Sequence, residues 1–135
     1  MLAFDFGTRR IGVAVGDTAT RLAHPLATIA AERDEQRFAA IAALVAEWKP
    51  ARLVVGLPVH ADGTPHEVTV RAQRFGRQLA GRTGLPVDYA DERHTTTAAA
   101  SSLAEAGRTG RDARAVRDQV AAQMILQGWL DAHGR

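Results

Sequence analysis

The sequence predicts an α/β fold in which a mixed five-stranded sheet is flanked by helices. Two short apolar segments, residues 2–6 and 10–16, are separated by a glycine turn and predict an antiparallel hairpin. Later in the chain, short apolar runs alternate with amphipathic segments, which is the pattern of βα units. An antiparallel meander followed by βα units implies a mixed sheet with helices packed on its faces.

The hairpin and one further strand make up the expected meander. In its second strand, β-branched residues alternate with the small residues Gly12, Ala14 and Gly16. Alternate residues of a strand point to opposite faces, so one face of this strand is small and favours close packing by another element. A third strand is expected around residues 26–30, within "HPLATIA".

The βα units follow. Apolar residues recur at helical spacing from Phe38 to Trp48 and predict a helix that stops before Pro50. The continuous apolar run "RLVVGLP" is typical of a strand buried on both faces. A second helix is expected to start at a capping box formed by Thr64 and Glu67. Its apolar side consists of Val68, Ala72, Phe75 and Leu79.

The last third of the chain is expected to hold a strand and two helices. "LPVDYA" predicts the fifth strand, and the acidic segment "DERHTT" follows it. An alanine- and serine-rich helix should end at Gly107. The basic segment "RTGRDARAVR" then leads into a last helix that runs to about residue 132.

Composition bounds the protein class. With 135 residues, 46% of them hydrophobic and 24% charged, the chain fits one domain spanning residues 1–135. It has no cysteine, which excludes disulfides, thiolate metal sites and cysteine nucleophiles. We see no signal peptide and no apolar window long enough for a membrane span, so we expect a soluble, cytoplasmic protein without a membrane partner.

Three carboxylates stand in unusual places. Asp5 interrupts an apolar strand, where a charge is costly unless it is paired or bound to a metal. Glu92 follows Asp91 at the expected end of the fifth strand, the edge at which βα folds collect ligands. Asp118 heads a stripe of the last helix that continues with Ala122 and Ile125 and should face the sheet.

Each carboxylate also has an ordinary explanation. Asp5 could face solvent or pair with Arg9 or Arg10, and an acidic pair before a helix stabilises the helix dipole. If the three converge, they form an all-oxygen site suited to Mg²⁺ or Mn²⁺. One or two such ions can activate water for phosphodiester hydrolysis. The histidines lack zinc spacing, and no GxxxxGK[ST] phosphate loop occurs.

Five ordered segments resemble the motifs of one family. "DFGTRRIGVAVGD", "HPLATI", "LVVGLP", "DERHTT" and "DQVAAQMILQGWLD" are similar in order and spacing to those of the YqgF family, also called RuvX. The family is described as Holliday-junction-resolvase-like proteins and pre-16S rRNA nucleases. The resemblance implies a ribonuclease H-like fold and a nuclease whose catalytic, metal-binding residues are Asp5, Glu92 and Asp118.

The sequence departs from the family pattern at a few positions. His94 stands where leucine is usual, and Arg9 where lysine is frequent. The histidine could tune Glu92, contact substrate or be a surface substitution. Junction resolvases proper carry a further acidic residue near the end of the fourth strand, where this chain has "VVGLPVH". That difference argues against junction-resolving activity.

Arginine supplies nearly all of the positive charge. Of the 17 Lys and Arg residues only Lys49 is lysine, and the net charge is +2. Codon bias would explain this preference, but guanidinium groups also bind phosphate better than ammonium groups do. Four arginines step by three residues up to Arg117, beside the proposed acidic site. The expected nucleic-acid-binding residues are Arg9, Arg10, Arg93, Arg108, Arg111 and Arg114.

These features favour a metal-dependent nuclease that acts on structured RNA in the maturation of pre-16S rRNA. Branched DNA is the alternative substrate, and a nucleic-acid-binding factor without catalysis is the alternative class. "DFGTRRIG" also resembles the phosphate-binding hairpin of actin-like ATPases, but those proteins need two such lobes. The sequence leaves open whether the protein is a monomer or a homodimer.

Overall fold

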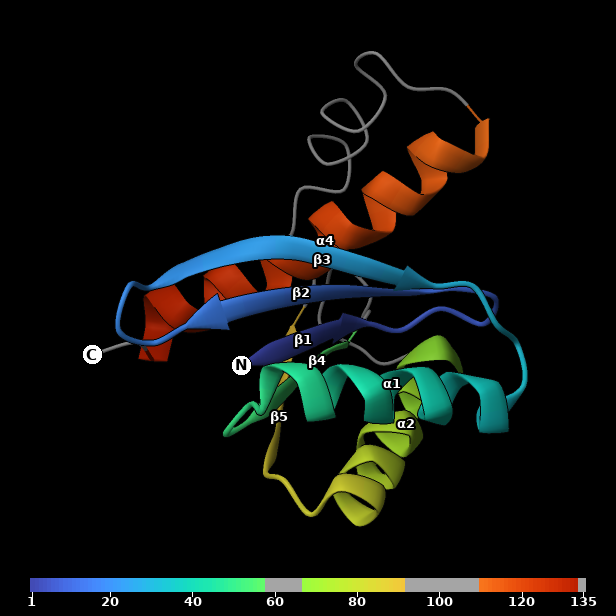
Figure 1. The fold of residues 1–135 in the computed structure, drawn as a ribbon, viewed down its shortest axis with the longest axis horizontal. Helices are drawn as coiled ribbons and strands as arrows, with labels where there is room; N and C mark the ends of the chain where they lie inside the picture. Colours follow the sequence, from blue (N-terminus) through green and yellow to red (C-terminus); the bar gives the residue numbers. More distant parts are fainter. Residues whose placement is uncertain (58–66, 92–109, 134–135) are drawn as a thin grey trace.

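The computed structural model describes residues 1–57, 67–91 and 110–133 of the chain (Figure 1). Within these ranges it contains one five-stranded sheet and the helices that cover it. In chain order the elements are β1 (Leu2–Asp5), β2 (Ile11–Asp17), β3 (Leu22–Ile29), α1 (Asp34–Trp48), β4 (Leu53–Leu57), α2 (Glu67–Thr83), β5 (Val87–Asp91) and α4 (Gly110–His133).

The sheet is mixed, as the sequence predicted. Its strand order is β3-β2-β1-β4-β5. The three strands of the meander pair antiparallel, whereas β4 pairs parallel to β1 and to β5. The ends of β1, β4 and β5 therefore meet at one edge of the sheet. Asp5 lies at this edge as the last residue of the central strand, one residue before the expected strand end at residue 6.

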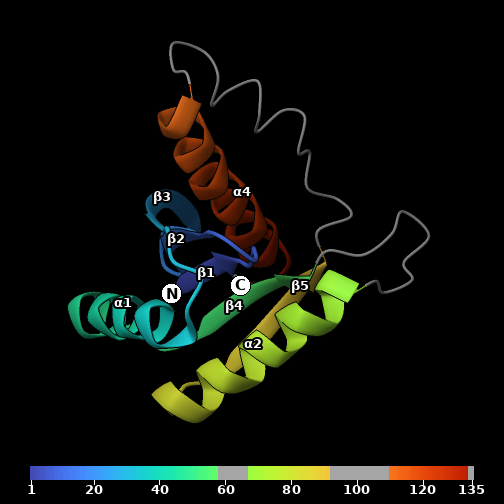
Figure 2. The same cartoon turned by 90° about the vertical axis from the view of Figure 1, so that its right-hand side faces the viewer.

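Helices cover both faces of the sheet (Figures 1 and 2). On the face covered by α1 and α2 the core is bulky and aromatic. The ring centroid of Phe75 lies 6.0 Å from that of Phe4 and 5.8 Å from that of Phe38. On the face covered by α4 the core is made of smaller strand residues, among them Ala3 and Ala14. The sheet thus has one face that accepts large rings and one that admits a helix at close range.

Helix α4 approaches the sheet most closely at β2. A Cβ atom added to Gly12 would lie only 1.9 Å from the backbone oxygen of Asp118. One added to Gly16 would lie 2.8 Å from a methyl carbon of Leu126. Helix α4 therefore packs on the face of β2 that carries its small residues. This confirms the expectation that the small face of this strand is packed closely by another element.

Three glutamines at four-residue intervals attach α4 to the edge strand β3. Gln119 donates to the Thr28 hydroxyl at 3.3 Å, and Gln123 donates to the Ala23 carbonyl at 3.0 Å. The Gln127 side chain accepts from the Ala23 amide at 3.0 Å and donates to the Arg21 carbonyl at 2.8 Å. Residues four apart share one helix face, so this row bonds the Thr28 side chain near one end of β3 and the backbone groups of Ala23 and Arg21 near the other.

Two boundaries differ from the sequence prediction. Strand β3 begins at Leu22, several residues before the expected start, because its ladder with β2 continues to the pair Asp17–Leu22. Pro25 is tolerated within it since β3 is an edge strand. Helix α4 begins at Gly110, so the part of the basic segment from that residue onward is helical and does not merely precede the helix.

Other predictions about local structure fall into two groups. The capping residue Thr64 and the helix expected to end at Gly107 lie outside the described residues. The helices from Phe38 to Trp48 and from Val68 onward, and the strand in "RLVVGLP", are confirmed. Among the described residues no helix is both long and apolar enough to cross a membrane.

The close approach at β2 predicts a strong effect of Gly12→Ala. The added methyl group would meet helix backbone at Asp118, which no rotamer change can relieve, so we expect a loss of about 3 kcal/mol in the free energy of unfolding. Gly128→Ala is the matched control, because nothing lies within 4 Å of a Cβ at that position of α4. Helix propensity should then make it stabilising by about 0.5–1 kcal/mol. Urea denaturation of both variants checks the difference, and an unfolding midpoint unchanged by Gly12→Ala would contradict the packing.

Candidate active site

Two of the predicted carboxylates share a cavity. Asp5, from the end of β1, and Asp118, from the third turn of α4, line a cavity of about 280 Å³. The turn between β1 and β2 supplies the remaining lining residues, which are Gly7, Thr8, Arg9 and Arg10. Two carboxylates that are 113 residues apart in the chain, at 5 and 118, are thus brought together with two arginines.

The sheet register explains why these carboxylates meet. Asp5 pairs with Gly12 across the antiparallel ladder. It also shares a strand face with Ala3, whose neighbours belong to the core under α4. Because Gly12 has no side chain, the backbone of Asp118 can rest on β2 beside Asp5. Gly12 therefore sets how close the backbone of Asp118 comes to the strand end that carries Asp5.

An ion pair already engages Asp118. The Nε atom of Arg10 donates to Oδ2 of Asp118 at 2.6 Å, and the two side chains are 36% and 20% exposed. Arg9 differs although it lines the same cavity, because its Nε lies 3.9 Å from Oε1 of Glu32 and both side chains are largely exposed. A charge-assisted bond at partial burial is stronger than an exposed pair at that longer distance. Of the two arginines that line this cavity, Arg10 is thus the one that is bonded to a carboxylate of the site.

Arg37 fixes the turn that carries these residues. It is a buried residue of α1, and its Nη2 donates to the carbonyl of Gly7 at 2.7 Å while its Nε donates to the carbonyl of Ala31. The guanidinium also lies over the ring of Phe6, 5.5 Å from its centroid. Burial lowers the pKa of Arg37, and Asp34 and Glu32 partly oppose that shift. No sequence pattern pointed to Arg37, because one charged side chain in an amphipathic helix gives no sign that it points inward.

A second cavity adjoins the first through Arg10. It has a volume of about 470 Å³ and is lined by Arg10, Thr28, Ala30, Arg114 and Ala115. The Thr28 hydroxyl donates to the carbonyl of Ala115 at 2.7 Å, which ties the end of β3 to α4. Arg114 is exposed and lies one helical turn before Asp118. Two guanidinium groups therefore line one hollow beside the carboxylates.

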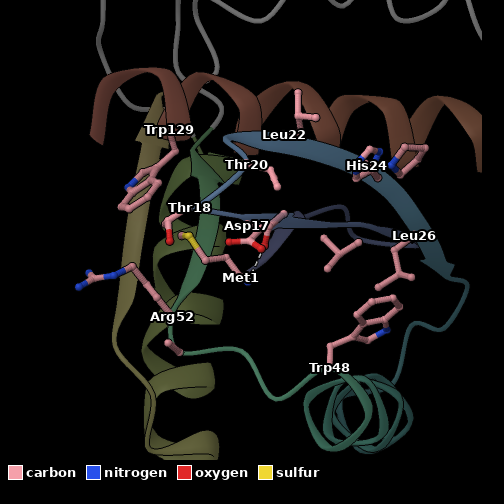
Figure 3. Close-up of a pocket in the computed structure, with 14 residues that line it drawn as sticks. Met1, Asp17, Thr18, Thr20, Leu22, His24, Leu26, Trp48, Arg52 and Trp129 are labelled. Atoms are coloured by element: carbon pink, nitrogen blue, oxygen red, sulfur yellow. Dashed lines mark hydrogen bonds between the residues drawn. The ribbon is translucent and has the colours of Figure 1, made fainter. Parts of the chain in front are cut away.

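A larger cavity lies at the opposite end of the sheet. It measures about 740 Å³, and its lining includes Met1, Asp17 and Trp129. Figure 3 shows Trp129 of α4 and Trp48 of α1 on opposite sides of it. Met1 precedes β1 and Asp5 ends it, so about 13 Å of strand separates this cavity from the carboxylates. Its size suits a ligand, but it does not contain the predicted site.

Several predicted site residues are not described. Glu92, Arg93, His94 and Arg108 lie outside the described residues, and the same holds for the side chain of Arg111, whose backbone belongs to α4. Strand β5 ends at Asp91, opposite Leu57 and at the sheet edge where β1 ends. In the described parts of the chain no group of three or more Asp, Glu, His or Cys side chains could hold a metal ion.

Arginines of α4 do not form a straight row. A step of three residues turns an α-helix by about 300°, so each arginine is displaced by about 60° around the axis from the one before it. Arg114 is exposed, whereas Arg117 is partly buried and has a partner of its own. Of the predicted basic stripe, the described side chains thus support Arg114 as the solvent-facing member.

Comparison with known proteins decides the family. The model of the RuvX family, described as "Holliday junction resolvase", matches residues 1–132. The chain therefore belongs to the RuvX family. The resemblance stated from the sequence motifs is confirmed, and the mixed sheet flanked by helices is the ribonuclease H-like fold of RuvX.

Bacterial relatives of this RuvX chain are similar over almost its whole length. It is 58% identical over 132 residues to a protein of Dechloromonas aromatica, covering 98% of this chain and 90% of the relative. Identity is 54% over 134 residues to a protein of Chromobacterium violaceum, covering 98% of each. A protein of Neisseria gonorrhoeae is 55% identical over 130 residues, covering 96% of this chain and 86% of the relative. All three relatives carry the name "Putative pre-16S rRNA nuclease".

The role of Arg37 can be measured as stability. Arg37→Met keeps much of the apolar stem but leaves the carbonyls of Gly7 and Ala31 without this donor, so we expect a loss of about 2–4 kcal/mol. Arg33→Met is the control, because Arg33 is exposed and makes no side-chain capping bond to α1. Its effect should stay within about 0.5 kcal/mol. Equal unfolding midpoints for the two variants would show that Arg37 does not fix the turn.

Proposed function

We propose that this RuvX-family chain is a divalent-metal-dependent nuclease that hydrolyses phosphodiester bonds of precursor 16S rRNA in the cytoplasm. The observation that carries the proposal is the shared cavity of Asp5 and Asp118, with Arg9 and Arg10 in its wall. Carboxylates supply ligands for a hard cation, and arginines supply ligands for phosphate. The name carried by the relatives supports precursor rRNA as the substrate.

The donor set fits Mg²⁺ or Mn²⁺. The carboxylates of Asp5 and Asp118 are oxygen donors from two elements, and hard divalent ions prefer oxygen. Two carboxylates are a minimal set, and Glu92 would be the third because it follows the last residue of β5 at the same sheet edge. A divalent ion held there supplies an activated water and stabilises the leaving oxygen.

The chain's own residues would position the substrate. Arg10 and Arg114 border one hollow and can hold backbone phosphates on the α4 side of the carboxylates. Arg9 is largely exposed and can contact a phosphate further from the site. Arg37 holds the backbone of the turn between β1 and β2 in place, so that the main chain that carries Arg10 keeps its position beside Asp5. Such contacts fix orientation without reading base sequence.

Branched DNA is the second candidate substrate. The family description "Holliday junction resolvase" favours it. Against it stands the sequence of β4, whose described residues are apolar or glycine and offer no additional carboxylate near the end of that strand. A cleavage assay with precursor rRNA, a four-way DNA junction and unstructured strands, each with and without Mn²⁺, separates the two substrates.

Asp118→Asn distinguishes an enzyme from a binding module. The amide keeps the size of the side chain but removes the charge that would hold a divalent ion, so cleavage should fall at least about 100-fold. Binding measured without divalent ions depends on the arginines and should stay near normal, as followed by fluorescence anisotropy. Asp5→Asn and Glu92→Gln should behave alike, and double variants should add little because the carboxylates act as one unit.

Metal exchange is the control for that experiment. Removal of divalent ions should abolish cleavage by the wild-type protein, and Mg²⁺ or Mn²⁺ should restore it, whereas Zn²⁺ alone should not. Folded Asp118→Asn protein that cleaves at the wild-type rate would overturn the proposed site. The chain would then be a nucleic-acid-binding factor.

The cavity arginines should contact phosphate and not bases. Arg114→Gln should weaken RNA binding about equally for all sequences and reduce the slope of log affinity against log salt by about one unit. Arg77→Gln is a matched control, because Arg77 is exposed on α2, on the opposite face of the sheet. A changed sequence preference with an unchanged salt slope would argue for base contacts.

A further inference from the structure

We infer that Arg10 exchanges Asp118 for a backbone phosphate when substrate binds, so that substrate and metal ion bind interdependently. The inference rests on the proposed nuclease function and deepens it. It concerns a part of the site that neither the family description nor the relatives' names address. Its structural basis is the position of one guanidinium between the cavity that contains both carboxylates and the cavity that contains Arg114.

Arg10 is the residue that the two cavities have in common. It lines the 280 Å³ cavity with Asp5 and Asp118, and it lines the 470 Å³ cavity with Thr28 and Arg114. Its side chain is 36% exposed, and Arg10 lies in the turn between β1 and β2, in the wall of both cavities, so the guanidinium can move from one to the other without crossing the core. A small movement of this single side chain changes which cavity receives its charge.

With Arg10 on Asp118, the carboxylate is less available to a cation. The guanidinium occupies Oδ2 at 2.6 Å and neutralises one of the two described carboxylates. A divalent ion at the same carboxylates would stand close to a fixed positive charge, and like charges at such range repel. Metal binding in the absence of substrate is therefore opposed by the ion pair.

The neighbouring cavity offers Arg10 an alternative partner. Arg114 lies across it, and Ala30 and Ala115 leave room for a phosphate group. The Thr28 hydroxyl already donates to the Ala115 carbonyl and accepts from Gln119. Among the side chains that line this cavity, the guanidinium groups of Arg10 and Arg114 are therefore the ones that can bind an anion. Arginine binds phosphate through strong charge-assisted hydrogen bonds. A phosphate seated here attracts Arg10 away from Asp118.

Thermodynamic linkage makes the effects of substrate and metal ion on each other's binding equal. If substrate phosphate releases Asp118, the ion binds more tightly to the substrate complex than to the free protein, and the ion must strengthen substrate binding by the same factor. The free protein would then keep its site in a low-affinity state. Metal would be held firmly only where a phosphodiester is present to be hydrolysed.

The test measures Mn²⁺ affinity without RNA, from the electron paramagnetic resonance signal of free Mn²⁺. Arg10→Gln should bind Mn²⁺ about five to ten times more tightly than the wild type, within the usual range of coupling between sites. Arg9→Gln is the matched control, because it removes the same charge from the same cavity but its partner is Glu32. It should change the affinity less than about twofold.

Two further variants isolate the ion pair. In an Asp118→Asn background, Arg10→Gln should change Mn²⁺ affinity by less than about twofold, because the carboxylate that Arg10 occupies has gone and only the weaker effect of its charge remains. A phosphorothioate RNA dodecamer, with its own Mn²⁺ binding subtracted in a protein-free blank, should raise the Mn²⁺ affinity of the wild type about fivefold. The same RNA should raise it much less in Arg10→Gln and in Arg114→Gln.

The outcomes separate this inference from the proposed function. Equal or weaker Mn²⁺ binding by Arg10→Gln overturns the exchange, as does an equal gain in Arg9→Gln, which would indicate net charge alone. If Asp118→Asn still weakens Mn²⁺ binding in that case, the metal site itself stands. If neither wild type nor Arg10→Gln binds Mn²⁺, both the exchange and the proposed metal site fail.

Discussion

The contact between α4 and Gly12 is the constraint on which the site depends. Asp5 lies at the end of the central strand and pairs with Gly12, and the backbone of Asp118 rests directly on that glycine. Any side chain at this position would lift the helix and carry Asp118 away from Asp5. The glutamine row along β3 and the small residues of β2 hold α4 at this short distance along its length. The absence of a side chain at Gly12 thus determines how far Asp118 lies from Asp5.

The two faces of the sheet contribute differently to stability and to the placement of the site. Phenylalanines under α1 and α2 bury large apolar areas, and such burial is the dominant stabilising term in folding. The face under α4 buries small residues, which contribute less per residue but permit close approach of the helix backbone. A buried Arg37 connects the aromatic side to the site, since it reaches from α1 to the turn after Asp5. The stable half of the fold therefore supports the turn that carries the charges.

Sequence patterns predicted the fold well because they report burial. Alternation in β2 and helical spacing around Phe38 and Phe75 each reflect a face that must avoid water, so elements and topology follow from them. The pairing of Asp5 with Asp118 in one cavity was also foreseeable, as both interrupt apolar patterns. The sequence did not reveal the inward direction of Arg37 or the pairing of Arg10 with Asp118 rather than with phosphate. Those features depend on side-chain direction and on neighbours distant in sequence, which no local pattern records.

In a site with both carboxylates and arginines, ion pairs between them compete with the binding of metal ions and phosphate. Here Arg9 is directed to Glu32 at the surface, whereas Arg10 is held on Asp118 in a partly buried bond. Arg9 therefore remains accessible to solvent and substrate. Arg10 stays bonded to Asp118 until a stronger anion competes for its guanidinium group. Since the net charge is only +2, attraction of nucleic acid must come from local placement of arginines and not from an overall field. The same reasoning makes the Arg10–Asp118 pair, rather than either residue alone, the unit that responds to substrate.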